Sequence, residues 1–360
     1  MTAIAMGTYN VCAIVGGLIR CWGSLEALGD GRPPRAGTPF DRPVTVLDID
    51  DAVDVALGRE FACALRADTT VMCWGLGDDG QLGDGIFHRD EQGVEVAVGR
   101  PQSVPGLTGV VDVAAGADHA CALLESGRIK CWGSDQVGQL GDEDAHELEP
   151  FGSATPVDVP GVTNAVQISA QGSQSCALLE DESVVCWGTP AVSVFVAEPT
   201  PTLVPDATNV ANVTCGTNHA CVLGSDGSAS CWGMGNYGEL GTGDYMPRDR
   251  ASAVNGVEDV IQLAGAFYHT CALLSDRSAR CWGHGDFGEL GDGIFHMSPI
   301  LDIVRVNLTG IDEIVASGFR TCARVNGSRI YCWGNGELGT LGDDTLHESA
   351  TPVEIHGVLP

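Results

Sequence analysis

Positive charge is scarce in this sequence. Its 360 residues carry 48 Asp and Glu against 18 Lys and Arg, a formal net charge of -30 at pH 7, and Lys130 is the only lysine. A protein that binds DNA or chromatin needs a basic surface to neutralise phosphates, and no segment supplies one. We therefore expect no nucleic acid among its partners. The acidity itself fits either a well-solvated surface or a saline habitat.

Long apolar runs are also missing. No stretch of 18 or more apolar residues occurs, so we expect no membrane span in this segment. Residues 1–7 lack the charged start, apolar stretch and cleavage site of a signal peptide. Because Met1 falls in phase with a repeat and Pro360 closes the last one, we expect a chain trimmed to its domain. An export signal or anchor removed with the flanks stays an open alternative.

Recognisable catalytic motifs are absent as well. The sequence has no Gly-x-Ser-x-Gly elbow, phosphate-binding Gly-x-x-x-x-Gly-Lys or His-Glu-x-x-His. Acidic glycine-rich segments at 77–80, 83–85, 285–288 and 291–293 suggest calcium, whose ligands are carboxylates and carbonyls. None has EF-hand or nonapeptide spacing, and Gly with Asp is ordinary turn chemistry. We therefore predict no enzyme, no catalytic residue, no cofactor and no metal.

What the sequence does contain is a repeat. Cys-Trp-Gly occurs seven times, at 21–23, 73–75, 131–133, 186–188, 231–233, 281–283 and 332–334. Short alternating apolar runs bounded by Gly, Asp and Pro indicate strands joined by turns. A period near 50 residues with about four strands is typical of β-propeller blades, because one such sheet cannot bury both faces alone. We predict an all-β, seven-bladed β-propeller, monomeric, with residues 1–360 forming a single domain.

The chain ends match different parts of the repeat. Residues 3–7 resemble residues 54–58, and residues 351–355 resemble residues 155–159. The C-terminal segment thus supplies the part of the repeat that should come before the N-terminal segment. We expect the N- and C-terminal segments to close the ring by pairing in a shared blade, which would leave no open sheet edge.

Fourteen of the fifteen cysteines form local pairs, one in each repeat. The pairs are Cys12 with Cys21, Cys63 with Cys73, Cys121 with Cys131, Cys176 with Cys186, Cys221 with Cys231, Cys271 with Cys281, and Cys322 with Cys332. In the third repeat a three-residue loop at 125–127 makes Leu124 face Arg128 and brings the two cysteines opposite each other. Opposed residues on antiparallel strands lie within reach of a disulfide. The fifteenth cysteine, Cys215, aligns with Ala115 and is expected to be a buried small residue.

Seven disulfides are the prediction for these pairs, and seven pairs of buried thiols are the alternative. Zinc is disfavoured because the pairs lack Cys-x-x-Cys spacing and are dispersed around the ring. Disulfides imply an oxidising compartment, so we expect a periplasmic, secreted or cell-surface protein.

An ordered set of residues recurs in register across the repeats. In the third repeat it is Gly116, His119, Leu123, Trp132, Gly133, Gly138, Leu140 and Gly141, and the fifth repeats it from Gly216 to Gly241. Over essentially the whole chain this pattern resembles the regulator of chromosome condensation repeat family, in a bacterial-type, cysteine-paired form. The resemblance implies a seven-bladed propeller. It also implies several functions, since the founding members are guanine-nucleotide exchange factors on chromatin and relatives include a plant ultraviolet-B receptor and secreted bacterial inhibitors of β-lactamase.

Two departures bear on function. The chain has no basic tail for chromatin, and paired cysteines argue against the reducing cytosol where small GTPases work. The tryptophans lie in Cys-Trp-Gly motifs, which indicates core packing rather than light sensing.

Histidines fall into two repeat-phased sets, His119, His219 and His269, and His88, His146, His296 and His347. For the first set we expect structural hydrogen bonds.

Loops that break the repeat are the candidate contact sites. In the fourth repeat an irregular segment with Phe195 at its centre replaces Gly-x-Leu-Gly, and the second repeat has a long loop over 87–101 that begins with Phe87 and His88. Drift in a tolerant loop is the alternative. The sequence thus predicts a non-enzymatic scaffold that binds an unknown protein or glycan outside the cytoplasm. A guanine-nucleotide exchange factor for a small GTPase remains the second hypothesis, by family resemblance.

Overall fold

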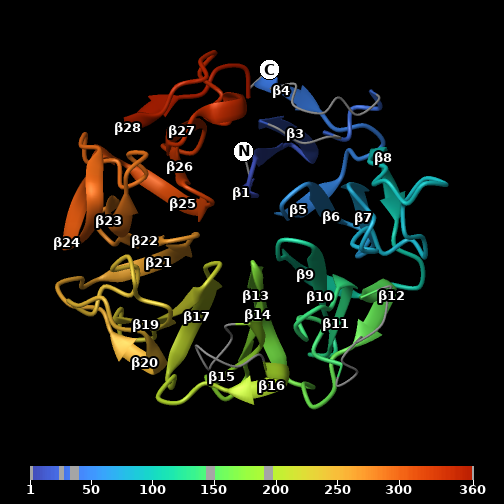
Figure 1. Cartoon of the computed structure of the whole chain (residues 1–360), viewed down its shortest axis with the longest axis horizontal. Helices are drawn as coiled ribbons and strands as arrows, with labels where there is room; N and C mark the ends of the chain where they lie inside the picture. Colours follow the sequence, from blue (N-terminus) through green and yellow to red (C-terminus); the bar gives the residue numbers. More distant parts are fainter. Residues whose placement is uncertain (1–2, 24–27, 33–39, 143–150, 190–197, 359–360) are drawn as a thin grey trace.

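Each repeat folds into one antiparallel four-stranded sheet, because its short apolar runs alternate with turns that reverse the chain. The computed structural model describes residues 3–23, 28–32, 40–142, 151–189 and 198–358. Within these residues the strands form seven sheets, each of four consecutive strands. We number the sheets as blades one to seven in chain order. The prediction of an all-β, seven-bladed propeller is confirmed (Figure 1).

The strands of blades one to four are β1 (Ala3–Met6), β2 (Asn10–Val15), β3 (Leu18–Gly23), β4 (Phe40–Thr45), β5 (Ala52–Leu57), β6 (Phe61–Arg66), β7 (Val71–Gly75), β8 (Val98–Ser103), β9 (Val110–Ala115), β10 (His119–Leu124), β11 (Ile129–Ser134), β12 (Gly152–Asp158), β13 (Ala165–Gln171), β14 (Ser173–Leu179), β15 (Val184–Thr189) and β16 (Glu198–Leu203). Those of blades five to seven, with one short 3-10 helix, are β17 (Val210–Cys215), β18 (His219–Gly224), β19 (Ala229–Gly233), β20 (Arg248–Ala253), β21 (Val260–Gly265), β22 (His269–Leu274), β23 (Ser278–Gly285), β24 (His296–Thr309), β25 (Ile311–Ser317), β26 (Arg320–Val325), β27 (Arg329–Gly334), η1 (Glu337–Gly339) and β28 (Ser349–Glu354). The first strand of every blade is innermost (Figure 1).

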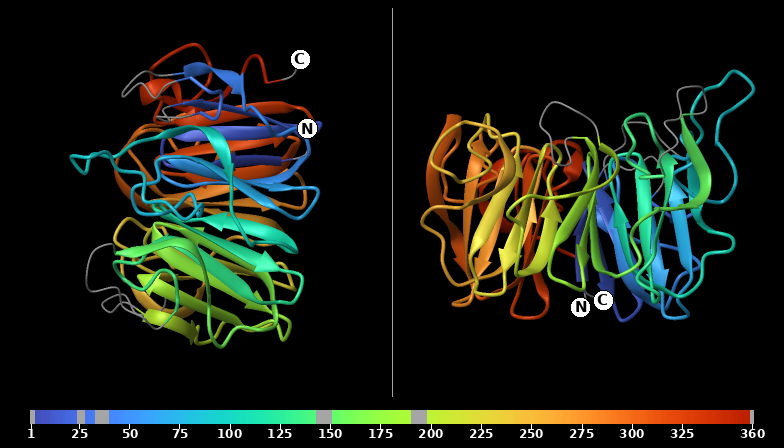
Figure 2. Two further views of the ribbon diagram at one scale, coloured as in Figure 1. Left: turned by 90° about the vertical axis from the view of Figure 1, so that its right-hand side faces the viewer. Right: turned by 90° about the horizontal axis from the view of Figure 1, so that it is seen from below.

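The expected shared blade at the chain ends is wrong. Blade one uses only β1–β4 and blade seven only β25–β28, so the final strand completes its own blade against β27. The terminal blades are nevertheless neighbours, and the two chain ends lie on the same side of the disc (Figures 1 and 2). Ile4 and Trp22 of blade one share a hydrophobic cluster with Leu341 and Ile355 of blade seven. The ring therefore closes through buried side chains rather than through a shared strand.

The paired cysteines are directly opposed, as the loop lengths predict. Cys121 faces Cys131 in blade three, and Cys12 faces Cys21 across the shorter hairpin of blade one. The same register opposes Cys63 and Cys73, Cys176 and Cys186, Cys221 and Cys231, Cys271 and Cys281, and Cys322 and Cys332. Each of the seven pairs is joined in a disulfide with Cα atoms 4.1 Å apart, so the alternative of buried thiols does not hold. Every blade thus carries one covalent link between its second and third strands.

The tryptophans form the core between blades. All seven are fully buried, and the indole Nε1 of Trp187 donates to the carbonyl of Gln139 in the preceding blade at 3.0 Å. A Cβ on Gly141, which has φ +74°, would lie 2.9 Å from the Trp187 ring. The last glycine of Gly-x-Leu-Gly therefore lets one blade's loop close over the next blade's tryptophan. This contact explains why the two motifs recur together.

A second set of contacts joins blades through the histidine position. His119 Nε2 lies 2.8 Å from Ser175 Oγ in the next blade, and His219 Nε2 lies 2.8 Å from Thr270 Oγ1. Burial lowers the pKa of both histidines to about 4, so they are neutral at pH 7. A Cβ on Gly116 would lie 2.0 Å from His119 Cε1, which requires glycine three residues before the histidine. The expected structural hydrogen bonds are confirmed.

The innermost strands surround a channel with a cavity volume of about 540 Å³. Gln167 bridges neighbouring blades there: its Nε2 donates to the Val213 carbonyl at 3.3 Å, and the Val213 N–H donates back to Gln167 Oε1 at 3.1 Å. Asp112 holds the equivalent position but only accepts, from the Ile168 N–H at 3.3 Å. Burial, with the nearby Asp54 carboxylate, raises the pKa of Asp112 to about 7.

Two further expectations from the sequence concern membrane-spanning segments and the unpaired Cys215. Among the described residues, no helix has the length and apolar character needed to cross a membrane. Cys215 is buried and unpaired, and its Sγ lies 3.3 Å from the Ser169 carbonyl. Burial raises the pKa of this thiol to about 12, so it is a packed side chain rather than a reactive thiolate.

Candidate functional site

The loops that follow the first and third strands of each blade lie on the same side of the disc, because neighbouring strands run in opposite directions. In blade two these loops are residues 58–60 and 76–97. We call this side the loop face. Figure 2 shows its loops rising above the disc while both chain ends lie on the opposite side.

An aromatic cluster covers one part of the loop face. Its members come from blades five, six and seven and are Tyr237, Phe267, Tyr268, His284, Phe287 and Phe319. Ring centroids of Tyr237 and Tyr268 are 4.4 Å apart, and those of Phe287 and Phe319 are 4.9 Å apart. The Tyr and Phe side chains are half-buried. Part of each ring therefore remains at the surface, while the rings pack against one another and hold each other in place.

Buried carboxylates hold the cluster from below. Glu239 and Glu289 are fully buried. The N–H of Tyr237 donates to Glu239 Oε2 at 2.7 Å, and the N–H of Phe287 donates to Glu289 Oε2 at 3.0 Å. Each carboxylate thus fixes the backbone that carries a ring, which limits the entropy that the loop would lose on binding.

One imidazole contacts Glu289 on one side, and its Nε2 lies 3.6 Å from Asp286 Oδ2 on the other. His284 Nδ1 lies 2.6 Å from Glu289 Oε1. Burial lowers the pKa of His284, but the Glu289 hydrogen bond and the neighbouring carboxylates outweigh burial and leave the pKa above its ordinary value. Burial raises the pKa of Glu239 to about 7. Buried titratable groups therefore lie beneath the cluster, and Glu239 among them has a pKa of about 7.

The other side of the loop face has a different chemistry. Where blade six carries Phe267, blade two has Arg59, which forms an ion pair with Asp118 of blade three at 2.9 Å. Where blade six carries Phe287, blade two has Asp79. Loop positions that are aromatic on one side are thus charged on the other. The loop face is thus aromatic on one side and charged on the other, a difference that the repeated scaffold does not require.

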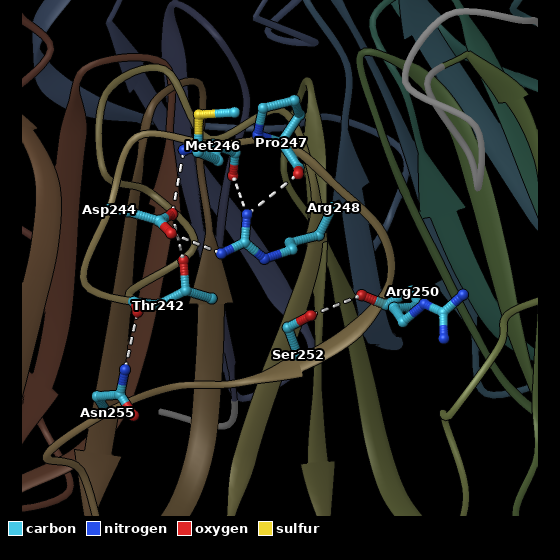
Figure 3. Close-up of polar contacts among 8 residues, drawn as sticks. All are labelled: Thr242, Asp244, Met246, Pro247, Arg248, Arg250, Ser252 and Asn255. Atoms are coloured by element: carbon cyan, nitrogen blue, oxygen red, sulfur yellow. Dashed lines mark hydrogen bonds and ion pairs between the residues drawn. The ribbon is translucent and has the colours of Figure 1, made fainter.

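The loop before β20 extends the apolar side outward. Asp244 accepts from Arg248 Nη2 at 2.7 Å and from the Met246 N–H at 3.1 Å, and Arg248 also donates to the Met246 carbonyl (Figure 3). The Arg248 hydrogen bond lowers the pKa of Asp244. Locked in this way, the loop holds Met246 60% exposed. Tyr245 also remains exposed while its hydroxyl donates to the Pro299 carbonyl at 2.9 Å.

Two of the contact residues predicted from the sequence, Phe87 and His88, lie away from the aromatic cluster. Phe195 falls outside the described residues. Phe87 and His88 are half-buried in the long loop of blade two, where His88 Nε2 lies 2.8 Å from Asp84 Oδ2. Large apolar side chains are exposed near them: Val94 in this loop at 59% and Ile86 just before it at 54%. The structure does not bring Phe87 or His88 to the aromatic cluster.

Sequence reasoning missed the aromatic cluster because its members lie in three repeats and none belongs to a motif. A signal was present: Tyr237 and Phe287 occupy one repeat position, the residue before the first glycine of Gly-x-Leu-Gly, in consecutive blades. Metal ligation finds no support in the part of the chain that the structure describes, where no three His, Cys, Asp or Glu side chains are grouped to hold an ion.

Comparison with known proteins gives the family context. The family model for the RCC1-like domain matches residues 18–359. Protein pim1 of Schizosaccharomyces pombe is 30% identical over 202 residues, which cover 52% of this chain and 36% of pim1. The chain thus spans about a third of that relative's length.

Two solved structures share the fold. Prp20p from Saccharomyces cerevisiae, described together with its binding to Gsp1p and histones, aligns with a TM-score of 0.81 at 22% identity and covers 98% of this chain and 88% of Prp20p. The CRINKLY WD40 ectodomain of the Arabidopsis thaliana receptor kinase ACR4 aligns with a TM-score of 0.56 at 21% identity, covering 99% and 98%. At these identities the likeness concerns the fold alone.

Proposed function

This chain belongs to the RCC1-like domain family, and on that premise we propose that it is a non-enzymatic propeller whose loop face binds a protein partner outside the cytoplasm. The observation that carries the proposal is the aromatic cluster. Aromatic side chains are enriched at the centres of protein interfaces and dominate their binding energy. The fold itself needs none of these rings, since blades two and three have no aromatic side chain at the equivalent positions.

The disulfides support the location. Seven of them, one in each blade, are compatible with an oxidising compartment and would be reduced in most cytosols. The ACR4 ectodomain is a precedent for this fold outside the cell. Thiol counting on protein from its native host tests the location: we expect one free thiol, that of Cys215, and fifteen free thiols would contradict it.

Loss of binding in a cluster variant tests the surface. Phe267→Ala combined with Phe319→Ala removes two rings that meet at 5.6 Å. Leu18→Ala is the control, because Leu18 is an apolar surface side chain that flanks a hairpin turn on the opposite side of the disc. The amount of partner crosslinked from the extracytoplasmic fraction should fall at least tenfold with the double variant and stay unchanged with the control. Equal capture by all three proteins would refute a role for the cluster.

A glycan ligand is the first alternative outcome, and a glycan array with the same variants detects it. Guanine-nucleotide exchange is the second, by analogy with the family. Its test is release of labelled nucleotide from small GTPases of the host. We expect no acceleration, because a protein exported to an oxidising compartment would not meet the small GTPases of the cytosol.

A further inference from the structure

Arg320 occupies an unusual place in the ring. It stands at the repeat position that holds His119, His219 and His269 in other blades, and it is only 2% exposed. Its Nη2 donates across the junction between the last and first blades, to the carbonyls of Gly7 at 3.0 Å and Thr8 at 2.6 Å. Its Nη1 is buried without a hydrogen-bond partner. The junction thus contains a charge where three other blades have neutral imidazoles.

No carboxylate balances this charge. Other arginines of this acidic chain reach one readily, such as Arg66 with Asp51 at 2.8 Å and Arg324 with Glu313 at 2.9 Å, but no ion pair involves Arg320 among the described residues. Burial lowers the pKa of Arg320 to about 10, so it stays charged at neutral pH. A buried cation without an anion is costly, and a bound anion would remove that cost.

A small pocket lies beside Arg320 at this junction. Arg320 lines it together with Tyr9, Phe267, Phe319 and Leu338, and its volume is about 80 Å³. That is room for roughly three water-sized groups, which matches the three heavy atoms of a carboxylate. Because Phe267 and Phe319 also belong to the aromatic cluster, the pocket opens within the proposed binding surface.

We infer that this pocket binds a carboxylate, supplied by an aspartate or glutamate side chain of the partner protein. Charge-assisted hydrogen bonds from a guanidinium to a carboxylate are among the strongest in proteins, and apolar walls strengthen them by excluding water. Glu337 at the pocket rim is exposed and opposes an incoming anion. The occupant depends on the proposed function, but the pocket itself is testable without a partner.

Sodium propionate, which reproduces a glutamate side chain, is the probe, and saturation-transfer NMR on the intact chain is the readout. We expect saturable binding of propionate and at least tenfold weaker binding of propionamide, which has the same shape without charge. Arg320→Met should abolish propionate binding. Glu337→Gln, which removes the opposing charge, should strengthen it two- to fivefold.

Because Arg320 also joins two blades, Arg320→Met needs a check by circular dichroism. Leu338→Trp fills the pocket while keeping the guanidinium. If Arg320→Met does not fold, loss of propionate binding in Leu338→Trp is the deciding measurement. Equal binding of propionate and propionamide, or propionate binding unchanged in Leu338→Trp, would overturn the inference. N-acetylglutamate α-amide should bind and N-acetylalanine should not, since the reverse would mean a chain terminus rather than a side chain.

The two proposals fail separately. Propionate binding without any captured partner would leave the pocket standing and remove the protein-binding function. A captured partner that binds the folded Arg320→Met and Leu338→Trp variants as tightly as the parent would leave the function standing and remove the pocket.

Discussion

His269→Gln tests whether the junctions between blades depend on neutral histidines. His269 is fully buried, and its Nε2 lies 2.9 Å from Thr321 Oγ1. The Thr321 hydroxyl donates its only proton to the Glu289 carbonyl at 3.0 Å, so His269 Nε2 must carry the proton of the imidazole. Its Nδ1 has no partner. Glutamine is a natural replacement, because Gln174 already bridges blades four and five from the equivalent position.

The magnitude follows from proton linkage. Burial, with smaller effects of His219 and His284, lowers the pKa of His269 from 6.5 to about 3. Since the folded pKa lies below the unfolded one, the stabilisation is complete above pH 6.5 and is lost as the pH falls from 6.5 toward 3. Between pH 7.5 and pH 5.0 the unfolded chain gains a proton at this site and the folded chain does not, which costs about 2 kcal/mol. Glutamine does not titrate and avoids this cost.

The assay is urea unfolding followed by tryptophan fluorescence at pH 7.5 and pH 5.0, without reductant so that the disulfides persist. Relative to the parent, His269→Gln should gain about 2 kcal/mol of unfolding free energy on going to pH 5.0, whatever its stability at pH 7.5. The exposed His356 supplies the matched control, and His356→Gln should show no comparable gain. A pH-independent difference between His269→Gln and the parent would refute a buried, neutral His269.

Three further predictions concern stability. The folded pKa of Asp112 is raised from 3.8 to about 7, so the parent loses stability as the pH rises from 3.8 toward 7. Relative to the parent, Asp112→Asn should therefore gain about 2.5 kcal/mol of unfolding free energy between pH 5 and pH 8 in the same urea assay. A difference that stays constant with pH would contradict the raised pKa. Removing one disulfide with Cys121→Ala and Cys131→Ala should cost about 2.5 kcal/mol, because a loop of this size constrains the unfolded chain; an unchanged urea midpoint would count against it. Gly216→Ala should cost at least about 2 kcal/mol and lower the thermal midpoint, since its Cβ would lie 2.3 Å from His219 Cε1; a midpoint equal to the parent's would argue against that packing.

The fold was largely readable from local patterns. Hairpin loop lengths sufficed to place Cys12 opposite Cys21 and Cys121 opposite Cys131, because pairing within a hairpin depends only on the residues between the strands. Closure of the ring was not readable. Two ends that resemble complementary parts of a repeat do not reveal whether they share a blade, since this depends on whether the last strand finds a partner in its own sheet. In the structure β28 does, and Arg320 and buried apolar side chains join the terminal blades instead.

By itself the sequence determined the number of blades, the opposed cysteines and the buried tryptophans, because each follows from spacing within one repeat of about 50 residues. Only the tertiary structure decided which side chains share a surface. Tyr237, Phe287 and Phe319 are far apart along the chain and unremarkable one by one, but stacking of neighbouring blades brings their loops within contact distance. The same stacking buries Arg320 at the junction of the first and last blades, where no described carboxylate pairs with it. A repeat specifies its own blade, whereas a binding surface arises from the differences between blades once the ring has assembled.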